Sequence, residues 1–268
     1  MPRLIPISDP DDPRLAPYRA IRERDLVGRE GQFIAEGTVV LEVLLAASRH
    51  RPVSLLLSER RAGGLLAKLE RLPAEIPVYS APDEIIAQIA GFQVHRGVLA
   101  LGQSTALEGA EAALAALPDR ALILVLIGIA NHDNMGGLFR NAAAFGVDLV
   151  LLDATSCDPL YRKAIRVSVG GALLVPFARI APGTDIPALL AQHALPALAL
   201  SPAGETCLQE LPAMARAALI LGAEGPGLPA EILARSRTLR IPMASGFDSL
   251  NVATTSGIVL HHLRSRSS

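Results

Sequence analysis

Residues 239–263 read LRIPMASGFDSLNVATTSGIVLHHL, and this stretch predicts a short strand, a loop and a final helix. Pro242 closes the strand, because proline cannot donate a hydrogen bond to a sheet. Asp248 or Ser249 is expected to cap the helix, since both side chains offer an oxygen to its free N–H groups. Gly257 disfavours the helix by about 1 kcal/mol relative to alanine and would let another backbone approach. Taken alone, the stretch is best interpreted as an ordinary terminal helix with a polar cap.

The composition limits the class of protein. Half of the 268 residues are apolar but only 3% are aromatic, so the core must be built from aliphatic side chains. The net charge of −1 provides no general attraction to nucleic acid, and any RNA-binding surface must be a local patch. Cys157 and Cys207 lack metal-ligand spacing, so we expect no metal site and a reducing, cytoplasmic location. No apolar run approaches the roughly 20 residues of a membrane span, and the acidic start does not resemble a signal peptide.

Two regions of alternating strands and helices are expected along the chain. Residues 1–30 form an N-terminal extension that includes a basic amphipathic helix at 18–29. A smaller α/β domain covers 31–103, and 104–119 is interpreted as a linker or short linker helix. The larger domain covers 120–268, where continuous apolar strands separated by helices predict a parallel sheet covered on both faces.

The expected elements follow from the apolar periodicity. In the larger domain we expect strands at 122–127, 149–152, 173–176, 197–200, 218–221 and 238–241. Between them we expect helices at 136–145, 160–168, 185–193, 208–215 and 229–236. In the smaller domain we expect strands at 33–35, 53–57, 78–79 and 94–101, with helices at 39–47, 63–72 and 83–90.

The first unusual junction follows the most apolar strand and reads IANHDNMGGLFRNAAAFG over residues 129–146. Asn134 lies in the turn, Gly136 and Gly137 open the helix, and Arg140 lies one helical turn further on. Ligands of parallel sheets bind beyond the carboxyl ends of the strands, so this turn is well placed for binding. Capping by Asx turns explains the asparagines but does not explain an arginine among small apolar neighbours.

Two further junctions have similar features. Residues 221–228 read LGAEGPGL, where the glycines allow close backbone approach and Glu224 has little local helix to support. The pattern is neither the glycine fingerprint of dinucleotide-binding proteins nor a P-loop. In the terminal stretch, Ser249 and Asn251 lie where exposed helix N–H groups can hold a ligand. Each junction alone is a weak signal, but the three in order indicate one shared site.

In this order, the three segments resemble motifs one, two and three of the SpoU (TrmH-type) RNA ribose 2′-O-methyltransferases of the SPOUT superfamily. The matching residues are Asn134-x-Gly136-Gly137-x-x-Arg140-x-Ala142, Leu221-Gly222-Ala223-Glu224-Gly225-x-Gly227-Leu228, and Ile241-Pro242-Met243 followed by Ser249-Leu250-Asn251-Val252. The resemblance covers the chain from about residue 120 to its end. More loosely, residues 31–102 are similar to the family's substrate-binding domain of ribosomal-protein L30e type, with Arg96 where glutamine is common.

The resemblance implies a C-terminal parallel-sheet domain with a deep trefoil knot, preceded by the smaller L30e-like α/β domain. It also implies a homodimer through the knot helices and S-adenosylmethionine as the cofactor, with no metal. The implied cofactor-binding residues are Gly222, Ile241 and Leu250, with Leu200, Ser201, Met243 and Gly225 on the neighbouring loops. The implied catalytic residues are Arg140, Asn134, Glu224, Ser249 and Asn251. The implied RNA-binding residues are Arg162, Lys163, Arg166 and Arg96.

The implied activity is methyl transfer from S-adenosylmethionine to a ribose 2′-OH of rRNA or tRNA. Because arginine resists deprotonation, we expect Arg140 to hold a phosphate and stabilise the developing alkoxide rather than act as the base. An alternative is an RNA-binding protein that kept the fold and lost catalysis, which the intact catalytic set argues against. A dinucleotide-dependent oxidoreductase is disfavoured by the missing glycine fingerprint.

Overall fold

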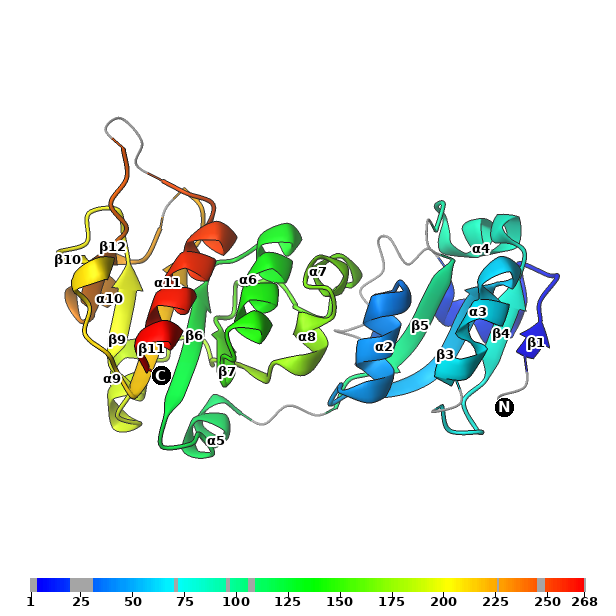
Figure 1. The fold of residues 1–268 in the computed structure, drawn as a ribbon, viewed down its shortest axis with the longest axis horizontal. Coiled ribbons are helices and arrows are strands. Elements are labelled where there is room, and N and C mark those ends of the chain that lie inside the picture. The colour runs from blue at the N-terminus through cyan, green and yellow to red at the C-terminus, as the bar shows by residue number, and fades with distance from the viewer. Residues whose placement is uncertain are drawn as a thin grey trace. The chain divides into compact units, whose positions relative to one another are not determined.

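The computed structural model describes residues 4–19, 31–69, 72–94, 97–105, 109–225, 227–244 and 249–267. The chain divides into two compact units (Figure 1). The first comprises Met1–Ala106 and Asp158–Leu174, and the second comprises Leu107–Cys157 and Val175–Ser268. The division falls within the expected linker 104–119, but the segment Asp158–Leu174 groups with the first unit. Among the described residues, no helix combines the length and the apolar composition that a membrane span requires.

The first unit contains a five-stranded sheet in the order β1-β4-β3-β5-β2. Strand β4 runs parallel to β1 and β3, whereas β5 runs antiparallel to β3 and β2. The strands are β1 (Leu4–Pro6), β2 (Gln32–Glu36), β3 (Arg51–Ser58), β4 (Val78–Ala81) and β5 (Val98–Gln103). The helices are η1 (Pro13–Tyr18), α2 (Thr38–Ala46), α3 (Glu59–Leu69), α4 (Asp83–Ala90), α7 (Arg162–Val167) and α8 (Gly171–Leu174).

The core of this unit is mostly aliphatic, as the composition predicts, although Tyr18, Phe33 and Tyr79 are also buried in it. Ile86 and Ile89 lie three residues apart on α4, and both belong to one buried cluster with Leu56 of β3 and Leu99 of β5. This spacing places both isoleucines on the same face of the helix. Burial of such side chains contributes roughly 1.5–3 kcal/mol each, so the apolar stripe of α4 holds it on the sheet.

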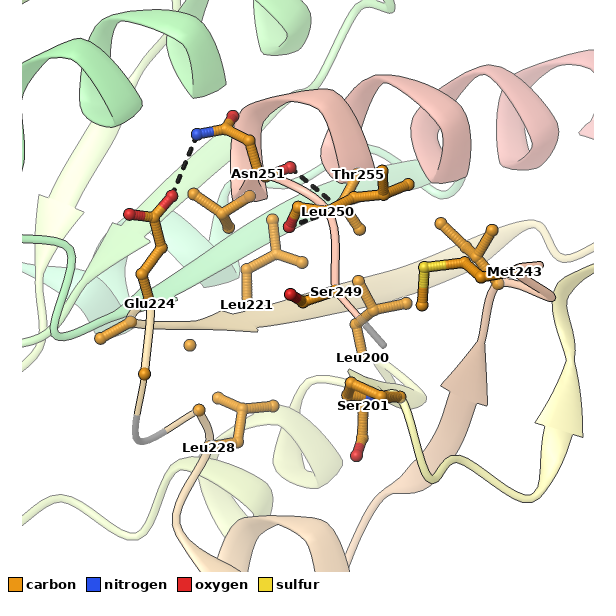
Figure 2. Close-up of a pocket in the computed structure, with 17 residues that line it drawn as sticks. Leu200, Ser201, Leu221, Glu224, Leu228, Met243, Ser249, Leu250, Asn251 and Thr255 are labelled. Atoms are coloured by element: carbon orange, nitrogen blue, oxygen red, sulfur yellow. Dashed lines mark hydrogen bonds between the residues drawn. The ribbon is translucent and has the colours of Figure 1, made fainter. Parts of the chain in front are cut away.

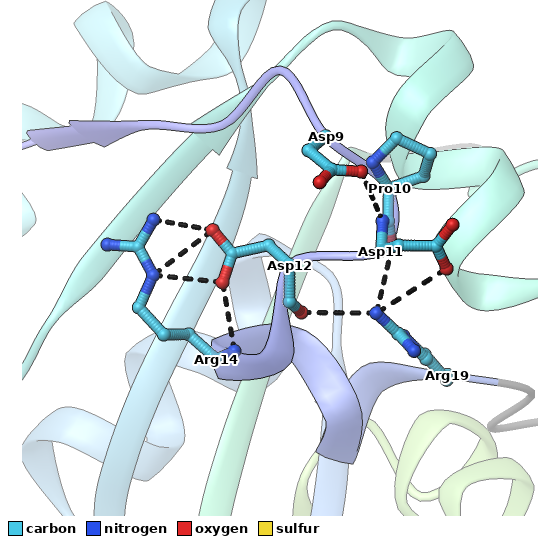
Figure 3. Close-up of polar contacts among 6 residues, drawn as sticks. All are labelled: Asp9, Pro10, Asp11, Asp12, Arg14 and Arg19. Atoms are coloured by element: carbon cyan, nitrogen blue, oxygen red, sulfur yellow. Dashed lines mark hydrogen bonds and ion pairs between the residues drawn. The ribbon is translucent and has the colours of Figure 1, made fainter.

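The N-terminal segment adds a strand and a short helix that the sequence analysis did not predict. The Asp12 carboxylate accepts hydrogen bonds from the backbone and the side chain of Arg14 and thereby caps η1 (Figure 3). The hydrogen bond from the Arg14 side chain is the main cause that lowers the pKa of Asp12 to about 2. Arg19 donates to the carbonyl groups of Pro10 and Asp12. The basic helix expected at 18–29 lies outside the described residues from residue 20 onward.

The second unit contains a seven-stranded parallel sheet in the order β10-β12-β9-β11-β6-β7-β8. The strands are β6 (Ala121–Ile127), β7 (Leu149–Leu152), β8 (Phe177–Arg179), β9 (Ala197–Leu200), β10 (Thr206–Cys207), β11 (Arg216–Gly222) and β12 (Arg237–Arg240). The helices are α5 (Ala110–Ala115), α6 (His132–Ala144), α9 (Ile186–Gln192), η2 (Leu208–Glu210), α10 (Ala230–Ala234) and α11 (Val252–Ser267). The α/β fold with a parallel sheet is therefore confirmed.

Helices α6 and α11 pack closely because small residues lie between them. A Cβ atom on Gly137 would lie 2.6 Å from the Cβ of Ala253, and one on Gly257 would lie 3.3 Å from Nδ2 of Asn141. The Asn141 side chain donates to the carbonyl of Ala253 and to the hydroxyl of Ser256. The close approach expected at Gly257 is thus made by α6 of the same chain, and it stabilises a helix that has weak propensity of its own.

Several expected elements differ from the structure in extent or in type. The strand expected at 173–176 is wrong, because 173 and 174 end helix α8 and strand pairing starts at the carbonyl of Pro176, which accepts from Val150. The helix expected at 208–215 is reduced to the single turn η2, since Pro212 cannot continue it. The helix expected at 39–47, with Thr38 as its cap, begins one residue earlier, at Thr38, and Gly37 occupies the N-cap.

His50 is a buried titratable residue of the first unit. Its ring is 3% exposed, packs edge-on against Phe33, and accepts a hydrogen bond from the backbone N–H of Thr105 through Nδ1. Burial, followed by the positive charge of Arg49, lowers the pKa of His50 to about 4. The unfolded chain binds this proton near pH 6.5, whereas the folded protein binds it only near pH 4.

We therefore expect the free energy of unfolding to fall by up to about 3 kcal/mol between pH 6.5 and pH 4 because of this one group. Urea unfolding across this pH range measures the effect. The control is His50→Asn, whose amide oxygen can still accept from Thr105 but does not titrate. Parallel pH profiles for the two proteins would contradict the assignment.

Candidate active site

A pocket of about 470 Å³ lies at the carboxyl ends of β9, β11 and β12 in the second unit (Figure 2). The strand order places these ends side by side, with β9 between β11 and β12. Four segments line the pocket. They are residues 200–202 after β9, residues 221–225 with 227 and 228 at the end of β11, Ile241 and Met243 after β12, and residues 249–252 with Thr255 at the start of α11.

All seven residues that the resemblance assigns to the cofactor line this one pocket. Most of the wall is apolar, with leucines from three loops around a central space (Figure 2). Such a lining suits an apolar ring system, whereas polar groups at its edge would fix the orientation of a ligand. The seven residues are Gly222, Ile241, Leu250, Leu200, Ser201, Met243 and Gly225.

The loop after β11 folds tightly on itself, and this requires glycine. A Cβ atom on Gly222 would lie 2.5 Å from the carbonyl carbon of Gly227, too close for any other residue without a backbone shift. Gly225 has φ +93°, which residues with side chains rarely adopt. A short bridge between Ala223 and Gly227 closes the loop. The backbone of this loop is therefore held at the pocket edge, where Glu224 projects from it.

Asn251 joins the three predicted motifs. Its Nδ2 donates to Oδ1 of Asn134 at 2.8 Å and to Oε1 of Glu224 at 3.0 Å. Its Oδ1 accepts from the backbone N–H groups of Ala253 and Thr254 at 2.9 and 3.3 Å. Asn251 is thus the residue that caps α11, in place of the expected Ser249 or Asp248; Ser249 lines the pocket, and Asp248 lies outside the described residues. Asn134, Glu224, Ser249 and Asn251 are brought together.

Arg140 is not part of this group. It lies on α6, six residues after Asn134, and its side chain is exposed. Within the described ranges it has no hydrogen-bond or ion-pair partner, and it does not line the pocket. Six residues correspond to about 600° of helix rotation, which directs Arg140 to a different side of α6 from Asn134. Of the five predicted catalytic residues, Glu224, Ser249 and Asn251 line the pocket, and Asn134 is hydrogen-bonded to Asn251 beside it.

The loop after β7, which the sequence analysis did not single out, fixes the start of the first motif. The Asp153 carboxylate accepts from the backbone N–H of Gly128 at 3.1 Å, and the Ser156 hydroxyl accepts from that of Ile129 at 3.0 Å. Burial alone would raise the pKa of Asp153, but hydrogen bonds from Ser156, Thr155 and Gly128 outweigh it and lower that pKa. In the sequence, this loop could have been recognised by an acidic residue and two hydroxyl residues that follow a buried strand.

The residues expected to bind RNA have different environments. Arg162 is largely buried in the first unit, where it forms an ion pair with Glu36 and lies 4.6 Å over the ring of Phe92. Its guanidinium thus faces an acid and not the solvent, contrary to the expectation of an RNA-facing side chain. Arg166 is exposed and Lys163 is partly buried, while Arg96 lies outside the described residues. No group of three or more potential metal-ligating side chains occurs in the described part of the chain.

The Asn251 contacts can be tested directly. Replacing Asn251 by alanine removes the cap of α11 and both contacts to the other motifs. We expect Asn251→Ala to lower the free energy of unfolding by about 1–2 kcal/mol, as measured by urea unfolding. The control is Thr254→Ala, an exposed side chain in the first turn of the same helix. Equal stability of the two variants would show that Asn251 does not hold the loops together.

The chain matches the model of the SpoU rRNA Methylase family over residues 121–261, which include every loop that lines the pocket. It is 41% identical to an uncharacterized tRNA/rRNA methyltransferase of Mycobacterium bovis over 97% of this chain and 91% of that protein. It is 28% identical to the 23S rRNA (guanosine-2′-O-)-methyltransferase RlmB of Coxiella burnetii over 82% of this chain and 90% of that protein.

The fold is likewise similar to a solved structure. The AdoMet-bound rRNA methyltransferase from Sinorhizobium meliloti superposes with a TM-score of 0.81 at 21% identity, covering 98% of both chains. The family match spans the sheet, the loops that line the pocket, helix α6 and the first part of α11, and the Mycobacterium relative extends the similarity to nearly the whole chain. The chain therefore belongs to the SpoU rRNA methylase family of RNA methyltransferases.

Proposed function

We propose that the protein transfers a methyl group from S-adenosylmethionine to a ribose 2′-OH of rRNA or tRNA. The observation that carries the proposal is that Asn251, which lines the pocket, hydrogen-bonds Asn134 of the first motif and Glu224 of the second. Family membership supports RNA methylation. The name of the Coxiella relative supports the 2′-oxygen as the acceptor, and the AdoMet-bound Sinorhizobium structure supports the methyl donor.

The pocket suits S-adenosylmethionine. Its volume of about 470 Å³ lies within the range of roughly 300–1,000 Å³ that small-molecule sites occupy. The apolar side chains of Leu200, Ile241 and Leu250 would contact the adenine, and the backbone of Gly222 and Gly225 would hold polar groups. When bound, this donor supplies an activated methyl group, so the protein itself needs no metal or covalent intermediate.

The residues around the pocket would align the acceptor and exclude water. Methyl transfer is an in-line displacement, and holding the hydroxyl in line with the methyl removes much of the entropic barrier. Glu224 is the one ionisable side chain among the described residues that line the pocket. We propose that Asn134, Glu224, Ser249 and Asn251 orient the ribose, and that the proton leaves to phosphate or water.

We propose that Arg140 acts from a homodimer formed through the knot helices α6 and α11. Arg140 is exposed on α6, and Ile258 on α11 is 40% exposed although it is a large apolar side chain. A second copy that packs against both helices would cover Ile258 and would bring Arg140 towards the pocket of the partner. There its guanidinium would hold the phosphate next to the target ribose and stabilise the developing alkoxide.

Two features of the fold belong to the same proposal. The strand order supports a deep trefoil knot. Helix α11 follows β12 in the chain, yet it begins beside Glu224. Glu224 lies in the loop after β11, and β9 lies between β11 and β12 in the sheet. The first unit would be the L30e-like domain that binds the RNA substrate. In it, Arg166, Lys163 and Arg96 would contact RNA, whereas the buried Arg162 would hold α7 against β2. An RNA-modifying enzyme of this kind would act in the cytoplasm.

The role of Arg140 leads to a kinetic prediction. We expect Arg140→Ala to reduce methyl transfer from labelled S-adenosylmethionine to RNA by about 100-fold or more. Cofactor affinity should stay unchanged, because Arg140 does not line the pocket. The control is Arg235→Ala, an exposed arginine paired with Asp185 away from the pocket. A wild-type methylation rate in Arg140→Ala, with normal cofactor binding, would remove Arg140 from the catalytic set.

The acceptor atom can be identified chemically. Alkaline cleavage of RNA requires a free 2′-OH next to the broken phosphodiester, so a 2′-O-methylated nucleotide leaves a gap in the alkaline ladder. We expect RNA from a strain lacking the gene to gain one such gap after treatment with the enzyme and S-adenosylmethionine. Methyl incorporation without a gap would indicate base methylation. RNA binding without any incorporation would support the alternative of a protein that has lost catalysis.

A further inference from the structure

The loop after β9 crosses over the end of β12. Leu200, the last residue of β9, pairs with Leu239 on one side of β12, and Thr206 of β10 pairs with the same Leu239 on the other side. Residues 201–205 must therefore pass over the carboxyl end of β12 to connect the two strands. Because residues 200–202 line the pocket, this crossing forms one of its walls (Figure 2).

The crossing is too tight for a side chain at position 204. A Cβ atom on Gly204 would lie 2.5 Å from the carbonyl oxygen of Leu239 and 2.9 Å from the backbone nitrogen of Arg240. The backbone N–H of Ser201 also donates to the carbonyl of Leu239 at 2.9 Å. The loop therefore lies directly on the last peptide of β12, and its height above the sheet depends on that contact.

Arg240 holds the loop in this position from the strand below it. One terminal nitrogen, Nη1, donates to the carbonyl oxygens of Gly204 at 2.7 Å and of Glu205 at 2.6 Å. The side chain is half-buried and has no carboxylate partner among the described residues. Hydrogen bonds from a charged donor are stronger than those from a neutral donor. The two carbonyl groups therefore fix the half-buried guanidinium of Arg240, and the guanidinium in turn fixes the loop.

We propose that Arg240 is a positioning residue for the methyl donor, an inference that rests on the proposed function. Its side chain fixes the wall formed by residues 200–202, and its backbone leads directly into Ile241, which lines the same pocket. One residue thus sets the relative position of two loops. Arg240 itself does not line the pocket, so it acts through these neighbours.

Arg237 provides a matched control on the same strand. It is exposed, and its Nε donates to the hydroxyl of Thr206 at 3.3 Å, whereas no hydrogen bond joins its side chain to the described residues 201–205. A loss of charge or of strand pairing in general would affect Arg237→Met and Arg240→Met alike. Only the loss of the contacts to Gly204 and Glu205 is specific to Arg240.

The test is titration calorimetry of S-adenosylmethionine against the full-length protein and its variants. We expect Arg240→Met to raise the Kd for S-adenosylmethionine about tenfold, because the loop that forms one wall of the pocket loses its hydrogen bonds to a charged donor. Arg240→Lys should give an intermediate Kd, because an ammonium group can reach one of the two carbonyls. Arg237→Met should bind like the wild type. In methylation assays, the KM for the donor should rise in Arg240→Met while kcat at saturating donor stays within about twofold.

Hydrogen exchange gives a second readout that needs no ligand. The backbone N–H of Glu205 donates to the hydroxyl of Thr238 at 3.1 Å, and its exchange should accelerate in Arg240→Met and Arg240→Lys but not in Arg237→Met. An unchanged Kd and unchanged exchange in Arg240→Met would overturn the inference while leaving the proposed function intact. A wild-type protein that binds no S-adenosylmethionine would overturn both.

Discussion

The side-chain amide of Asn251 is the contact on which the arrangement of the site depends. Both of its hydrogens are donated, to Asn134 and to Glu224, and its oxygen accepts from the first turn of α11. An aspartate could still cap the helix, but it has no hydrogens to donate and would repel the carboxylate of Glu224. A serine or threonine could cap as well, but it could not reach two loops at once. The position therefore requires an amide.

The parallel sheet explains why residues far apart in the sequence meet at this amide. Strand β11 lies between β9 and β6, and β12 lies next to β9, so the loops that follow these strands share one edge of the sheet. Helices α6 and α11 bring the first and third motifs together, because Gly137 and Gly257 remove the side chains that would separate them. The low helix propensity of α11 is tolerated since α6 supplies the missing stability.

Most of the second unit could be predicted from apolar runs, and the meeting of Asn134, Glu224 and Asn251 from three loops that carry glycine or asparagine. The contacts between polar side chains and the backbone of distant loops could not be predicted from the sequence. Asp153 and Arg240 act on backbone groups of other loops, and no local pattern shows where those groups are. Strand β1 was missed because a three-residue strand that contains a proline has no periodicity of its own.

Three arginines show how the same residue type divides between structure and function. Arg162 is neutralised by Glu36, and Arg240 is held by two carbonyl groups, so both charges are used within the fold. Arg140 has no such partner among the described residues, and its exposed position gives the folded chain no evident benefit. A long cationic side chain with no hydrogen-bond or ion-pair partner in the described part of the chain is available to bind an anion from outside. The phosphates of an RNA substrate are the anions that a member of this family must meet.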